Sequence, residues 1–116
     1  MNLKLENTRY EILSWLRILE YQQQEIIDMK TRIAEVIKGD VGKKILEELE
    51  EFQNVFLNKD MVIAFLKADI LRLKEEMRTN SELPDTLHTL RADMPKMEQE
   101  FNSLKRSFNE CIAKLL

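Results

Sequence analysis

The chain has few of the residues that interrupt or cross-link a fold. Its 116 residues include two glycines, two prolines and one cysteine. A single cysteine excludes an internal disulfide, so the fold depends on burial of apolar side chains. The chain has no glycine-rich loop, which excludes the folds that cradle a phosphate in such a loop.

The chain also lacks the marks of a metal centre and of a membrane span. Its single histidine, His88, has no glutamate three residues before it, whereas a di-iron bundle needs a Glu-x-x-His pair on each of two helices. The longest unbroken apolar run, Met61–Leu66, is far shorter than the roughly 20 residues that cross a bilayer. We therefore expect no metal, no cofactor and no membrane span.

No part of the chain is strongly basic. The formal net charge is −3, and acidic and basic residues are interleaved along the chain, with one acidic run at Glu47, Glu48, Glu50 and Glu51. Nucleic-acid binding needs a basic patch that displaces counterions, so we expect no nucleic-acid partner. The lone Cys111, and a first segment from Met1 to Glu11 without a signal-peptide hydrophobic stretch, indicate a cytoplasmic protein.

What the chain does have is a strict seven-residue apolar repeat in three successive segments. The repeats are Leu5, Ile12, Leu19, Ile26 and Ile33, then Leu49, Phe56, Ile63, Ile70 and Met77, then Leu87, Met94, Phe101, Phe108 and Leu115. Companion positions three residues later include Trp15, Met29, Val36, Ile45, Phe52, Leu66, Leu73, Leu90, Met97, Leu104 and Cys111. Such a repeat makes helices wind around one another. The sequence therefore predicts an all-α, elongated three-helix bundle with coiled-coil-like packing.

Both glycines fall between the first and second repeats, where we predict a short turn. Gly39 is expected to take the left-handed position that ends the first helix, and Asp40 to cap the second. A short connection makes the two helices antiparallel neighbours. We place them at about residues 3–38 and 41–79 of one domain, 1–116, with up-down-up topology.

The third helix is expected at about residues 84–115. Pro84 suits its first turn, and Ser81 or Asp85 is a candidate cap. Pro95 removes a backbone donor inside the repeat, which predicts a kink near that residue. The kink is interpreted as a bend around the core, with a functional hinge as the alternative.

Polar residues interrupt the first two repeats at similar distances from the turn. They are Gln22, Gln23, Lys59 and Asp60. We interpret Gln22, Gln23 and Lys59 as a polar layer that fixes register, because a slipped alignment would leave its groups unpaired. The alternative is a bundle enzyme, or a carrier of a small apolar ligand, with a pocket near these three residues.

The first two helices carry more apolar residues than one face of each helix can hold. The surplus residues include Tyr10, Leu13, Trp15, Ile18 and Tyr21 in the first, and Leu57, Val62, Phe65 and Leu71 in the second. We predict that they form the interface of a homodimer, because large exposed apolar patches usually mark association sites. The alternative is that they thicken the core of a monomer. The predicted function is a non-enzymatic scaffold or protein–protein interaction module, with a helical protein as a further possible partner.

The first helix, through Trp15, Leu16, Glu20, Arg32 and Val36, resembles a group of small bacterial helical-bundle proteins. The resemblance covers the first two helices at most and rests on no sharp motif. It implies a bundle fold and a bacterial source, and it brings no activity and no site residue.

Overall fold

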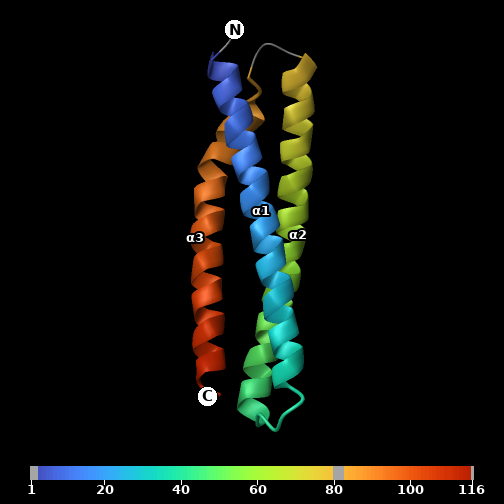
Figure 1. Cartoon of the computed structure of the whole chain (residues 1–116), viewed down its shortest axis with the longest axis vertical. Coiled ribbons are helices and arrows are strands. Elements are labelled where there is room, and N and C mark those ends of the chain that lie inside the picture. Colours follow the sequence, from blue (N-terminus) through green and yellow to red (C-terminus); the bar gives the residue numbers. More distant parts are fainter. Residues whose placement is uncertain (1–2, 80–82, 116) are drawn as a thin grey trace.

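The computed structural model describes residues 3–79 and 83–115, which form three long α-helices and no strand. The helices are α1 (Leu3–Val36), α2 (Lys43–Thr79) and α3 (Asp85–Ala113). Successive helices are antiparallel along one rod and run down, up and down in the view of Figure 1. The rod measures 61 × 18 × 18 Å. The predicted all-α, elongated three-helix bundle is confirmed. Each helix begins and ends within two residues of its expected limits.

The seven-residue repeats supply the core. Except for Leu5 and Leu115 at the two ends of the chain, which are partly buried, every residue of the three repeats is buried. Phe56 and Phe108 meet edge to face with ring centroids 5.4 Å apart, and Phe52 packs against both. Aromatic pairs of this geometry add about 0.5–1.5 kcal/mol to the effect of burial. The core is therefore a continuous apolar axis along the rod.

The turn between α1 and α2 differs from the expectation. Gly42, with φ of 76°, takes the left-handed conformation, and Gly39 does not. The Gly39 N–H donates to the Val36 carbonyl at 3.1 Å, while the Gly42 carbonyl accepts from the Leu46 N–H at 3.1 Å. The reversal in φ thus lies where α2 begins, since Gly42 provides its first acceptor. Asp40 lies before this point and makes no hydrogen bond to the first turn of α2.

At the start of α3, Pro84 occupies the N-cap position in an extended conformation, and no side chain caps the helix. The Leu87 N–H donates to the Pro84 carbonyl at 3.1 Å, so Asp85 is the first helical residue and not the cap. Ser81, the other candidate cap, lies outside the described residues. α3 continues through Pro95 without a break, and Figure 1 shows its first turns tilted relative to the rest.

Candidate interaction surface

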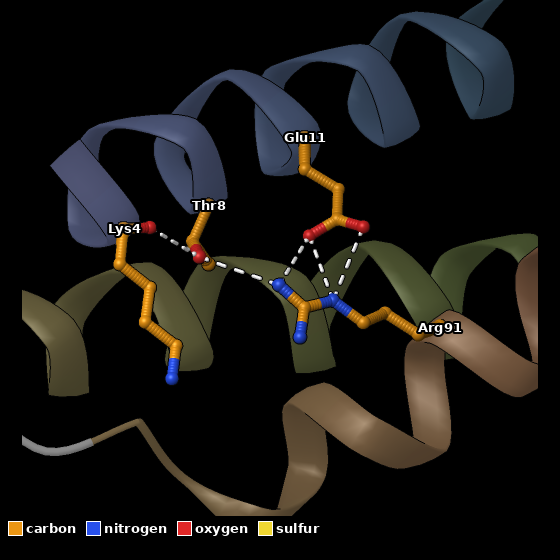
Figure 2. A network of polar contacts seen from close by, with 4 residues as sticks. All are labelled: Lys4, Thr8, Glu11 and Arg91. Atoms are coloured by element: carbon orange, nitrogen blue, oxygen red, sulfur yellow. Dashed lines mark hydrogen bonds and ion pairs between the residues drawn. The ribbon is translucent and has the colours of Figure 1, made fainter.

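A polar network joins α1 to α3 near one end of the rod (Figure 2). Thr8 is buried, and its hydroxyl donates to the Lys4 carbonyl at 2.9 Å. The Arg91 Nε donates to both Glu11 carboxylate oxygens, at 2.9 and 3.1 Å, and its Nη2 lies 3.4 Å from the Thr8 hydroxyl. Sequence reasoning missed this network. The available signal was Thr8 itself, which stands seven residues before Trp15 in the companion ladder.

Gln22, Gln23 and Lys59, the predicted polar layer, are not hydrogen-bonded to one another. Gln22 is buried, with 2% of its surface exposed, and its Oε1 atom has no hydrogen-bond partner. Gln23 accepts from the Lys67 Nζ at 3.1 Å. Lys59, whose side chain is 19% exposed, donates to Glu100 of α3 at 3.1 Å. The latter two therefore have partners at the edge of the bundle, and the buried oxygen of Gln22 has none.

A second ion pair joins α1 to α3 further along the rod. The Lys105 Nζ donates to Glu25 Oε1 at 2.8 Å and to the Tyr21 hydroxyl at 3.0 Å. The hydrogen bond from Lys105 lowers the pKa of the Glu25 carboxyl, and the same bond raises the pKa of Lys105. The two charges stabilise each other at a position that is only partly exposed.

Cys111 is buried at the expected ladder position. Burial raises the pKa of its thiol, and the S–H group donates to Glu48 Oε2 at 3.3 Å, which raises it further. A protonated, buried thiol is a poor nucleophile.

The predicted interface residues divide into two groups. Most of them are exposed: Tyr10, Leu13, Tyr21, Leu57, Val62, Phe65 and Leu71. Trp15 is a correction, because its exposed fraction is 7% and it belongs to the core. The reason is its position in the companion ladder between Thr8 and Gln22. Ile18 is partly buried against the same core.

The structure adds Met61, Ala64 and Ala68 to the exposed residues Leu57 and Phe65, which the sequence already assigned to the interface. Leu57, Met61, Ala64, Phe65 and Ala68 are all exposed and recur at helical spacing, on the side of α2 opposite the core. We call these five residues the α2 outer face. The apolar run Met61–Leu66 was the available signal, since a helix cannot bury six consecutive residues on one side.

The hollows on the surface differ between helices. One hollow on α1 is lined by Tyr10, Leu13, Ser14, Arg17, Ile18 and Tyr21. Another, between α1 and α2, is lined by Arg9, Ile12, Leu13, Lys74, Met77 and Arg78. One on α3 is lined by Pro95, Glu98, Gln99, Asn102, Ser103 and Arg106. None of these three is lined by Gln22, Gln23 or Lys59, where the enzyme or carrier alternative requires a pocket.

Within the described ranges, no three His, Cys, Asp or Glu side chains gather as a metal site would require. In the same part of the chain no helix is both long and apolar enough to cross a membrane. Comparisons with protein-family models, with curated proteins and with solved structures find no match for the chain. The resemblance of the first helix to small bacterial bundle proteins gains no support from them.

Proposed function

We propose that the protein is a non-enzymatic helical interaction module that self-associates as a homodimer through the outer sides of α1 and α2. One observation carries the proposal. Every large hydrophobic residue found exposed lies on α1, on α2 or in the turn that joins them, and α3 exposes none over Asp85–Ala113. A monomer with no partner would have no reason for this asymmetry, because all three helices meet the same solvent.

Phe65 is 68% exposed, although burial of a phenylalanine or leucine side chain is worth about 1.5–3 kcal/mol. A second chain that covers such residues recovers this free energy, and symmetric pairs are the commonest soluble oligomers. The expected compartment is the reducing cytoplasm, since the one cysteine is buried and unpaired.

The test is the mass in solution. Sedimentation or light scattering at micromolar concentrations should give twice the 13.8 kDa of the chain. A double variant, Leu57→Gln with Phe65→Gln, should raise the dimer Kd at least about a hundredfold, since every 1.4 kcal/mol lost is tenfold. Trp15 fluorescence cannot report the association, because this indole is buried within the single chain.

A matched control lies on α3. Gln99→Ala with Ser103→Ala changes two exposed residues of its outer side and should leave the Kd unchanged. A monomeric mass for the unsubstituted protein would refute the proposal. Equal weakening by the two double variants would also refute it, because the effect would then not depend on the apolar side chains.

A further inference from the structure

Exposed residues on the outer side of α2 stand at matched distances on either side of Met61. Three pairs of exposed residues stand about one, two and three helical turns on either side of it: Leu57 with Phe65, Asn54 with Ala68, and Glu50 with Arg72. All of them lie on the side of α2 that faces away from the core. Leu57 and Phe65 are both apolar, and Glu50 and Arg72 carry opposite charges. These two pairs are therefore complementary to a second copy of α2 turned through a twofold axis.

We propose, building on the self-association proposed above, that the α2 outer face is covered by α2 of a second copy, packed antiparallel about a twofold axis at Met61. Leu57 of one chain then faces Phe65 of the other, in both halves of the contact. Two apolar pairs flank the axis, and the thioether of Met61 lies on it. Methionine suits that place because its unbranched chain adapts to an identical neighbour.

Charge decides the orientation. In a parallel pair Glu50 would face Glu50 and Arg72 would face Arg72, whereas the antiparallel pair sets Glu50 against Arg72 at both ends. Both side chains are available for an ion pair between the two copies. Glu50 is exposed and makes no ion pair within the described residues, and Arg72 has only Asp69 as a partner, at 3.5 Å.

Side-chain size allows close approach of the two helices. Ala64 and Ala68 lie beside Phe65 and Met61 on the exposed side of α2. Small residues next to large ones leave the holes into which side chains of a facing helix insert. The corresponding side of α1 does not have this form, since Arg17 lies between Leu13 and Tyr21 in the hollow there.

Cysteine cross-linking tests the axis. In Met61→Cys, two thiols meet at the axis within reach of a disulfide. Tyr21→Cys is the matched control, because the two parent residues are 53% and 52% exposed. Under mild oxidation Met61→Cys should form a linked dimer about tenfold faster than Tyr21→Cys, since the pair holds its thiols at millimolar effective concentration. The unsubstituted protein, whose Cys111 is buried, gives the background.

Charge reversal tests the orientation. Glu50→Arg and Arg72→Glu should each raise the dimer Kd about fivefold, because the twofold axis repeats a surface pair worth about 0.2–1 kcal/mol. The double variant, Glu50→Arg with Arg72→Glu, should return the Kd to that of the unsubstituted protein. No effect of either single reversal would overturn the antiparallel arrangement.

The outcomes separate this inference from the function on which it rests. A dimeric mass with faster cross-linking at Tyr21 than at Met61 would overturn the α2 contact and leave self-association standing. A dimeric mass with slow cross-linking at both positions would also overturn it. A monomeric mass at micromolar concentrations would overturn the proposed function itself.

Discussion

α2 and α3 both bury a seven-residue apolar repeat, but their outer sides differ in polarity. In α2 the buried residues Phe56 and Ile63 stand opposite Met61 and Phe65, which are exposed. In α3 the buried residues Phe101 and Phe108 stand opposite exposed polar residues such as Gln99 and Arg106. The core needs only the inner pattern, so the outer side of α2 is a feature that the fold does not require.

Both helices are attached to the rest of the bundle by polar contacts, and α2 is joined to α1 by the Lys30–Asp60 ion pair at 2.6 Å. α3 is joined to α1 by the Arg91–Glu11 and Lys105–Glu25 ion pairs, and to α2 by Lys59–Glu100. Its outer residues are polar, which suits a helix that faces solvent. The outer sides distinguish the two helices, because that of α3 is polar and that of α2 carries exposed apolar residues. This difference supports the proposal that the protein associates through α1 and α2.

The largest effect on the free energy of unfolding is expected in the core, where α2 and α3 are alike. Phe56→Ala in α2 and Phe101→Ala in α3 should each lower the free energy of unfolding by about 3–5 kcal/mol, because both rings are fully buried. Phe65→Ala, on the outer side of α2, should change it by less than about 0.5 kcal/mol in dilute, monomeric protein. Denaturant titration followed by circular dichroism measures all three. An equal loss from Phe65→Ala would show that the outer side of α2 belongs to the core.

Gln22, a buried residue on the inner side of α1, is polar. Gln22→Leu should raise the free energy of unfolding by about 1–3 kcal/mol, since it removes a buried oxygen that has no hydrogen-bond partner. Gln24→Leu is the control, because Gln24 is exposed and its amide donates to Asp28 at 3.0 Å. Its effect should stay within about 0.5 kcal/mol. Destabilisation by Gln22→Leu would instead mean that the amide is satisfied by an ordered water.

The three-helix bundle could be predicted from the sequence because one period governs the inner side of every helix. Residues that obey the repeat, such as Ile26, Phe56 and Phe101, lie where the repeat puts them. Trp15 shows a limit, because it stands in the companion ladder and was also counted among the surplus apolar residues of the first helix. It is buried, as its place in the ladder predicts.

Contacts between helices were harder to predict. The repeat gives the side of a helix on which a residue lies, but it does not give the reach of long side chains. Arg91 reaches Glu11, and Lys59 reaches Glu100 instead of a partner in the polar layer. The left-handed residue of the turn was also predicted wrongly. Gly39 and Gly42 can both take this conformation, and only the start of α2 at Lys43 decides between them.

The smallest expected effect concerns the Lys105–Glu25 ion pair, which joins α3 to α1. It appears as a dependence of the stability of the fold on pH. The lowered pKa of Glu25 means that its ion pair with Lys105 stabilises the fold above the ordinary glutamate value of 4.5, and that this contribution is lost as the pH falls through the lowered value. The raised pKa of Lys105 means that its contribution is present below the ordinary value of 10.5 and is lost as the pH rises through the raised value.

The pair is partly exposed, so its contribution at neutral pH should not exceed about 1 kcal/mol. Glu25→Gln should therefore lower the thermal midpoint slightly at pH 7, and the difference from the unsubstituted protein should vanish in acid. Glu98→Gln is the control, because Glu98 also lies on α3 but makes no ion pair within the described residues, and it should show no such difference at either pH. Persistence of the Glu25→Gln difference in acid would mean that the side chain acts through packing and not through its charge.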